Sequence, residues 1–141
     1  MEHDEAQAVW RDYYARIRER RVDEAEQLIT ASRQDGITDQ CEVFLDFRHF
    51  SNVEADIEQL KVQLAENYEV SVSKYEAKDY WYLDGTTRPV PMAFERDQLL
   101  AWVKFMADVA QSYACVFSTW VLTQASTGKQ WGNESFEAIT D

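Results

Sequence analysis

Apolar residues recur at three- and four-residue steps near the start of the chain, a spacing that is typical of amphipathic helices. Between Glu5 and Arg20 this spacing is kept by five residues, which are Ala6, Val9, Trp10, Tyr13 and Ile17. A second helical stretch runs from Asp23, a suitable N-cap, to Gly36, a suitable C-terminal stop. The pattern predicts a helical segment over residues 1–36, either as two helices or as one bent helix.

The period of the pattern changes to two after residue 40, which indicates strands. The first strand has two alternating faces, one with Val43, Leu45 and Phe47 and the other with Phe44, Asp46 and Arg48. Tyr68–Tyr75 and Tyr80–Leu83 alternate in the same way, and the short polar link between them predicts a hairpin. Cys115–Leu122 is rich in β-branched and aromatic residues and predicts the last strand.

Two further helices are predicted between these strands. Ser51 and Glu54 have the spacing of a capping box, and apolar residues follow at helical spacing until Asn67. The broadest apolar stripe of the chain runs from Phe94 to Tyr113 and must face a sheet. Both prolines of the chain lie just before this stripe, so the connection that holds them is not a central strand.

The order strand, helix, strand, strand, helix, strand predicts an α+β fold of the ferredoxin-like βαββαβ type. We expect a four-stranded antiparallel sheet of order 4-1-3-2 with two helices on one face, preceded by the N-terminal helical segment. Residues 40–122 then form the domain, and residues 123–141 form a polar C-terminal tail. Cys41 and Cys115 begin neighbouring antiparallel strands at opposite ends, which argues against a disulfide between them.

The charge of the chain narrows the classes of partner. Its 14 Lys and Arg residues and 26 Asp and Glu residues give a net charge of −12 over 141 residues, a length typical of one domain. Such a field repels phosphate backbones and anionic lipids and attracts basic proteins. We therefore expect a basic protein partner, no direct binding of nucleic acid and no membrane association.

The first residues are acidic and lack the apolar stretch of a secretory signal, so we expect the mature chain to begin here. The longest uncharged run, Val109–Gly128, is too polar for a membrane span. Two cysteines in such a chain are typical of buried thiols in a reducing compartment. The sequence therefore predicts a cytoplasmic protein.

Several segments resemble the domain family called regulator of ribonuclease activity B. The likeness covers about residues 40–122 and rests on Glu42-Val43-Phe44-Leu45-Asp46-Phe47, the helix Asn52–Asn67, Tyr68-Glu69-Val70, Tyr80-Trp81-Tyr82, Pro91 and the long helix that closes on an aromatic strand. The family's last strand carries Tyr-Asp-Gly-Trp, whereas this chain reads Phe117-Ser118-Thr119-Trp120 and lacks the Asp-Gly centre. The resemblance implies a ferredoxin-like domain without a catalytic site, since the name-giving member inhibits ribonuclease E by physical association.

No catalytic site, metal site or cofactor is predicted from the residues. The two histidines, His3 and His49, and the two cysteines offer no closely spaced pair of zinc ligands. The four glycines lie too far apart for a phosphate-binding loop, and no serine occupies a nucleophile elbow. Cys115 could approach His49 across adjacent strands, but the pattern favours a buried thiol and a surface imidazole instead.

The strand alternation leaves one face of the sheet turned away from the two helices. This face carries aromatic, charged and small polar residues, which are Phe44, Asp46, Arg48, Ser71, Ser73, Tyr75, Tyr80 and Tyr82. It could be covered by the N-terminal stripe of Trp10, Tyr13 and Ile17, or it could anchor a protein partner. Base stacking is a third use, which the negative charge opposes.

The predicted partner-binding residues combine the tyrosines of this face with acidic residues around the hairpin, and they are Tyr75, Glu76, Asp79, Tyr80, Tyr82 and Asp84. The sequence favours a non-catalytic module that inhibits a partner enzyme, such as a ribonuclease or another nucleotide-acting enzyme, by direct association. A dedicated immunity protein that neutralises a secreted bacterial toxin fits the same features. A small-molecule-binding domain or enzyme and a self-associating scaffold are the alternatives from other classes.

Overall fold

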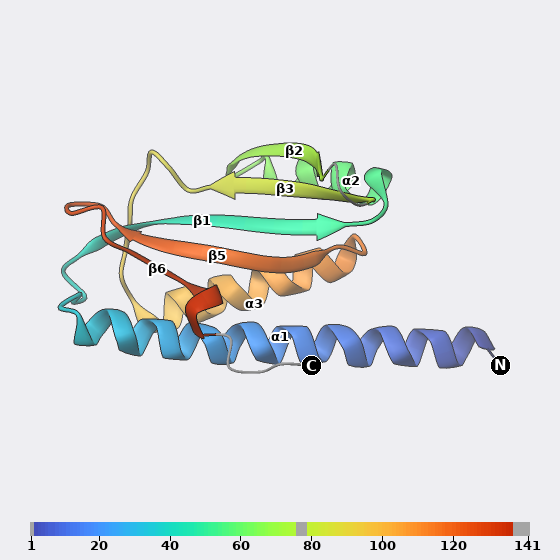
Figure 1. The fold of residues 1–141 in the computed structure, drawn as a ribbon, viewed down its shortest axis with the longest axis horizontal. Coiled ribbons are helices and arrows are strands. Elements are labelled where there is room, and N and C mark those ends of the chain that lie inside the picture. Colours follow the sequence, from blue (N-terminus) through green and yellow to red (C-terminus); the bar gives the residue numbers. More distant parts are fainter. Residues whose placement is uncertain (1, 76–78, 137–141) are drawn as a thin grey trace.

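The structure, a computed structural model, describes residues 2–75 and 79–136. It is an α+β fold in which three α-helices accompany an open, mostly antiparallel sheet of six strands (Figure 1). The elements in chain order are α1 (Glu2–Gln34), β1 (Glu42–Ser51), α2 (Glu54–Leu64), β2 (Glu69–Tyr75), β3 (Tyr80–Thr86), β4 (Met92–Ala93), α3 (Arg96–Ser112), β5 (Val116–Gln124), β6 (Gln130–Gly132) and the 3₁₀ turn η1 (Asn133–Phe136).

The sheet has the strand order β2-β3-β1-β5-β6, and the short β4 pairs with the start of β1. β1 is central because it pairs antiparallel with both β3 and β5. β2 and β3 form the predicted hairpin, whose register places Tyr75 opposite Tyr80. The strands pass in front of α2 and α3 in Figure 1, so one face of the sheet packs on these helices and the other does not.

The core lies between the sheet and the three helices, and period-two alternation decides which strand residues enter it. Val43, Leu45 and Phe47 of β1 are buried, as the sequence predicts. The ring of Phe47 lies over Gly85, and a Cβ atom at Gly85 would overlap the Phe47 Cζ atom. A side chain at position 85 is therefore excluded by the ring that fills its space.

The N-terminal segment is one continuous helix of 33 residues, about 50 Å long at 1.5 Å per residue. Its C-terminal half packs along α3 and η1, whereas its N-terminal end extends past the end of the sheet (Figure 1). Arg96 pairs with Glu26, and Arg18 pairs with Asp108 at 2.9 Å, so ion pairs join α1 to α3. The alternative of two separate helices that meet near Asp23 is therefore wrong, and α3 supports the single helix through ion pairs on both sides of Asp23.

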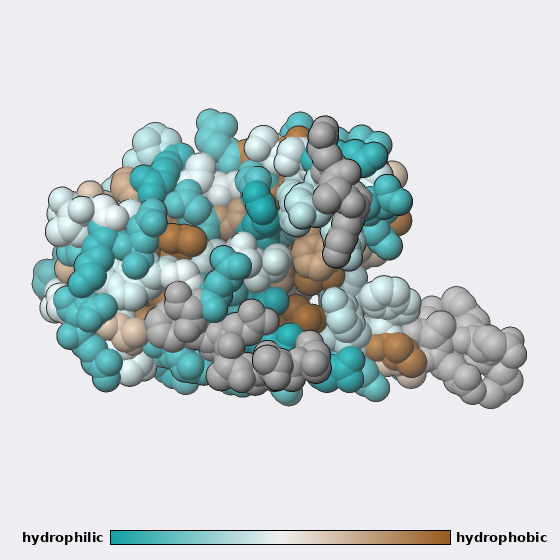
Figure 2. Space-filling view, viewed as in Figure 1, coloured by the Kyte–Doolittle hydropathy of each residue, from teal (hydrophilic) through white to brown (hydrophobic). Residues whose placement is uncertain are grey.

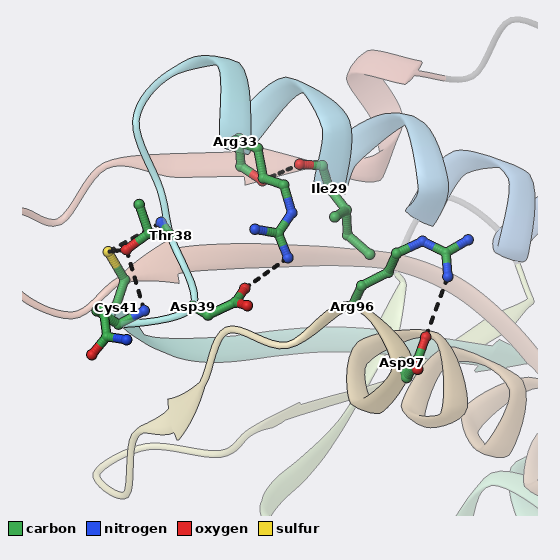
Figure 3. Close-up of polar contacts among 9 residues, drawn as sticks. Ile29, Arg33, Thr38, Asp39, Cys41, Arg96 and Asp97 are labelled. Carbon is green, nitrogen blue, oxygen red and sulfur yellow. Dashed lines mark hydrogen bonds and ion pairs between the residues drawn. The ribbon is translucent and has the colours of Figure 1, made fainter.

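The turn between α1 and β1 is held by local polar contacts (Figure 3). Arg33 pairs with Asp39 at 2.8 Å, and the Thr38 backbone N–H lies 3.5 Å from the Cys41 sulfur. In the same view Arg96 pairs with Asp97 at 3.2 Å at the start of α3. Both cysteines are free, and they lie at opposite ends of the β1–β5 pair, as predicted.

The predicted capping box at Ser51 and Glu54 is wrong. Ser51 is the last residue of β1, and its hydroxyl accepts a hydrogen bond from the Val53 backbone N–H at 3.1 Å. The helix begins at Glu54, and its N-cap residue Val53 makes no side-chain cap bond. The strand runs three residues further than its predicted end at Arg48, which moves Ser51 out of the cap position.

The polar tail predicted from Thr123 is also wrong for the residues that the structure describes. β5 continues to Gln124, and β6 then pairs with it and places Trp131 opposite Leu122. The Trp131 indole is buried and donates to the Asp35 carboxylate at 2.8 Å. Residues 137–141 of the predicted tail lie outside the described residues.

A buried polar network fixes η1 to α1 and β5. The Arg21 side chain donates to Glu24 at 2.8 Å and to the Phe117 carbonyl at 2.9 Å. Asn133 donates to Glu24 at 2.9 Å and accepts from the Trp120 backbone N–H at 2.8 Å. Each charged group in the network has a hydrogen-bonded partner, so the burial of the Arg21–Glu24 ion pair costs little. Because the network joins α1 to β5 and η1, it fixes the position of α1 relative to the sheet.

Candidate functional site

The sheet face turned away from α2 and α3 is called the open face here. It is formed by alternate residues of the strands, with Phe50 opposite Tyr82, Arg48 opposite Asp84 and Ser73 opposite Tyr82. Figure 2 views the molecule from this side and shows apolar residues set among a majority of hydrophilic ones. The assignment of faces from the sequence agrees with this register.

The tyrosines predicted to bind a partner lie together on the open face. The rings of Tyr75 and Tyr82 are 5.6 Å apart and nearly perpendicular, and Tyr80 packs against Phe50 at the same distance. Tyr75 is 40% exposed, and Tyr80 and Tyr82 are half-buried. These three residues thus form one aromatic surface with Phe50, which lies beyond the strand end that the sequence predicted.

The carboxylates predicted to join these tyrosines are placed differently from one another. Asp79 is exposed, and Glu76 lies outside the described residues. Asp84 is paired with Arg48, whose guanidinium donates two hydrogen bonds to it at 2.6 and 3.1 Å. The cross-strand arginine therefore offsets the charge of Asp84, and the role of Asp84 in partner binding stays a prediction.

The Arg48 guanidinium also stacks on Tyr82, with its carbon 4.2 Å from the ring centroid. The hydrogen bond to Asp84 and the charge of that carboxylate raise the pKa of Arg48, while burial opposes the rise. A second set repeats this arrangement, since Arg88 pairs with Asp46 at 3.3 Å and lies over the Phe44 ring at 4.6 Å. On the open face, the arginines that lie over Tyr82 and Phe44 are therefore each paired with an aspartate.

The N-terminal helix does not cover the open face. α1 packs against α3, η1 and β6 at the other side of the sheet, and Trp10 of the predicted covering stripe is 58% exposed. The helix also reaches β5 through the hydrogen bond of Arg21, and its N-terminal half passes beside the end of β1 and the start of β3. The alternative in which the first helix covers the open face is thus contradicted by the position of α1.

A hollow of about 450 Å³ lies where α1 passes the end of the sheet, and it is called the aromatic notch here. Figure 2 shows the molecule hollowed between α1 and the sheet end. Its walls are Trp10, Tyr13 and Tyr14 from α1, Phe50 from β1 and Tyr80 from β3, with Ala114 and Val116 between them. The notch is continuous with the open face because Tyr80 belongs to both.

Sequence reasoning missed Phe50 and Tyr14 as site residues. Phe50 follows Arg48 at the strand period of two, so a longer strand would have placed it on the same face. Tyr14 is buried, and burial raises its pKa to about 12, with further increases from Cys115, Tyr13 and Asp56. Its hydroxyl is therefore uncharged at neutral pH.

The pair of Cys115 and His49 offers no acid–base chemistry at neutral pH. Burial raises the pKa of the Cys115 thiol to about 12, with a smaller increase from the charge of Asp56. His49 is fully buried, which corrects the expected surface imidazole, and burial lowers its pKa to about 4. A neutral thiol and a neutral, enclosed imidazole do not provide an activated nucleophile.

A larger hollow of about 870 Å³ opens between the end of α2 and α3. Tyr68, Trp102 and Phe105 contribute aromatic side chains to it, and the Trp102 indole donates to the Tyr68 hydroxyl at 3.1 Å. This hydrogen bond uses the Trp102 N–H donor and the acceptor of the Tyr68 hydroxyl within the protein. Within residues 2–75 and 79–136, no group of three or more His, Cys, Asp and Glu side chains is arranged to hold a metal ion.

Among the described residues, no helix combines the length and the apolar composition that crossing a membrane requires. No protein-family model matches the chain, and no curated protein matches it. The resemblance to the regulator of ribonuclease activity B family therefore remains a prediction from the residues quoted for it.

Proposed function

We propose that this chain is a non-catalytic module that binds a basic partner enzyme through its open face and inhibits the enzyme by direct association. The observation that carries the proposal is an uncovered aromatic sheet face on a chain whose net charge is −12. Tyrosine is enriched at the energetic centres of protein interfaces, because it buries a large area at a small cost in side-chain entropy.

The fold that we propose for the module is ferredoxin-like. The path β2-β3-β1-β5 through the sheet and the placement of α2 and α3 behind it support this assignment. In this arrangement β6, η1 and α1 are additions at the β5 edge. They leave the outer face of β2, β3 and β1 free for a partner.

The charges of the open face support binding of a protein over binding of nucleic acid. Arg48 and Arg88 are matched by Asp84 and Asp46, so these two arginines of the described face are already paired and are not free for phosphates. A protein that covers the face meets charges that are already paired, which reduces the cost of removing them from water. The net negative charge then accelerates the approach of a basic partner at low salt.

Quantitative capture from a lysate of the source cell tests the proposal. The wild-type chain is compared with Tyr75→Ser/Tyr80→Ser at low and high salt, and bound proteins are identified by mass spectrometry. Phe105→Ser is the matched control, because Phe105 is a 45% exposed aromatic residue on α3, away from the open face. Circular dichroism checks that all three chains fold.

We expect the wild-type chain and the control to capture a basic enzyme that the double variant does not capture. Binding of this enzyme should weaken as the salt concentration rises. The purified enzyme should lose activity when the wild-type chain is added. Retention of every partner by the double variant, or no inhibition by the chain, contradicts the proposal. A captured secreted toxin instead of a resident enzyme identifies the chain as an immunity protein that uses the same face.

A further inference from the structure

Five aromatic rings from three elements converge on the aromatic notch. On the α1 side, the Trp10 ring lies 5.8 Å from Tyr13 and 5.9 Å from Tyr14, and the Tyr13 and Tyr14 rings are 5.5 Å apart. On the sheet side, Phe50 and Tyr80 pack at 5.6 Å. The two groups line the same hollow of about 450 Å³, one from α1 and the other from the sheet.

Aromatic rings on the sheet of this protein already hold cations. On the open face Arg48 lies over the Tyr82 ring and Arg88 over the Phe44 ring, and on the opposite face of the sheet Lys74 lies over the Trp81 ring at 5.4 Å. Among the residues that the structure describes, no arginine or lysine lies over any of the five notch rings. The notch is an aromatic site whose ring faces are not occupied by cations of the described chain.

Charges around the notch favour a positive occupant. Asp56 is close enough to Tyr14 to influence its ionisation, and Asp79 is exposed next to Tyr80 in the chain. The net charge of −12 adds to the local attraction. Arg16 is the exposed cation that lines the notch, and its charge opposes a positive ligand.

We propose that the aromatic notch binds the ammonium or guanidinium group of a lysine or arginine side chain from the partner protein. The cation would sit between the α1 rings and the Phe50–Tyr80 pair, held by attraction to the negative faces of the rings. That the cation comes from a protein rests on the proposed function, whereas the preference of the notch for cations does not. A side chain anchored there would extend the contact from the open face onto α1.

A pair of small probes isolates the contribution of the charge. Choline carries a trimethylammonium group, and 3,3-dimethylbutan-1-ol is its neutral carbon analogue of the same shape. Each is titrated into the full chain while the Trp10 indole N–H resonance is followed by NMR. We expect saturable binding of choline that is at least about fivefold tighter than that of the alcohol, which corresponds to about 1 kcal/mol of cation–π attraction.

Variants assign the binding to the notch. Trp10→Leu and Tyr80→Leu keep apolar volume but remove a ring, so each should weaken choline binding several-fold, as followed by the remaining notch resonances. Tyr75→Leu removes an open-face ring outside the notch, so it should leave the affinity for choline unchanged. Arg16→Gln should tighten choline binding about two- to threefold, because it removes a like charge.

Three results overturn the inference. Equal affinity for the alcohol makes the notch merely apolar, and absence of any shift removes the site. Weaker choline binding by Arg16→Gln contradicts the electrostatic argument, because removal of a like charge should strengthen the attraction of a cation. These results are independent of partner capture. If choline fails to bind while Tyr75→Ser/Tyr80→Ser still loses the partner, the notch inference falls and the proposed function stands.

Discussion

Acidification should destabilise this protein through one buried side chain. His49 is fully buried in the core, with its ring between those of Phe47 and Phe117 at centroid distances of 5.7 and 5.1 Å. Its Nε2 atom lies 3.4 Å from the Met106 carbonyl, and its Nδ1 atom has no hydrogen-bond partner among the described residues. A charged imidazolium in this position would lose its hydration and gain one weak hydrogen bond.

The sign and size of the effect follow from proton linkage. Burial lowers the pKa of His49 from 6.5 to about 4, so between these values the unfolded chain binds a proton that the folded chain does not. The stabilisation is complete above pH 6.5 and is lost as the pH falls from 6.5 towards 4. The lost free energy of unfolding is about 3 kcal/mol, a large part of the 5–15 kcal/mol that is typical of domains.

Urea unfolding at pH values from 7.5 to 4, followed by tryptophan fluorescence, measures this loss. His49→Phe removes the titrating group from an apolar site. Between pH 7.5 and 4 its free energy of unfolding should therefore fall by about 3 kcal/mol less than that of the wild type. His3→Gln is the control for the other histidine of the chain. Overpacking by the phenyl ring changes the free energy of unfolding of His49→Phe at every pH. The comparison with the wild type therefore uses the slope of the free energy of unfolding against pH. Parallel curves for wild type and His49→Phe would refute the reasoning.

Three further outcomes follow from close contacts. Gly85→Ala should lower the free energy of unfolding by about 1–3 kcal/mol because its Cβ meets the Phe47 ring, and Phe47→Leu should offset part of this loss in a double-mutant cycle. Asn133→Ala should cost about 2 kcal/mol in urea unfolding, since it leaves the buried Trp120 backbone N–H without its acceptor. Cys115 should react with iodoacetamide at pH 8 far more slowly than the other thiol, as peptide mass spectrometry would show, because burial raises its pKa to about 12.

The parts of the fold that the sequence predicted are those in which burial follows local period. Val43, Leu45 and Phe47 are buried because a strand turns every second residue to one face, and the helices behind that face need an apolar surface. The same alternation placed Tyr80 and Tyr82 on the open face. The predicted hairpin was also correct, because its short polar link allows only an antiparallel pair.

The sequence-based predictions were wrong where tertiary contacts bury a residue whose polar side chain suggests a surface position. His49 continues the period of the buried face after Phe47, yet its polar ring suggested a surface position. Asn133 lies in a polar stretch, but it is 2% exposed because its amide completes the network of Arg21 and Glu24. No local pattern predicts that network, since its members come from α1 and η1, more than a hundred residues apart.

The candidate site depends on segments outside the predicted domain of residues 40–122. The sheet supplies one wall of the aromatic notch, and α1 supplies the other through residues that precede its buried half. Tyr14 lies about two helical turns before Arg21, where the buried network begins. Because Asn133 closes that network, the C-terminal 3₁₀ turn fixes the angle at which α1 leaves the body. α1 and η1, which both lie outside the predicted domain, therefore position the α1 wall of the notch relative to the sheet.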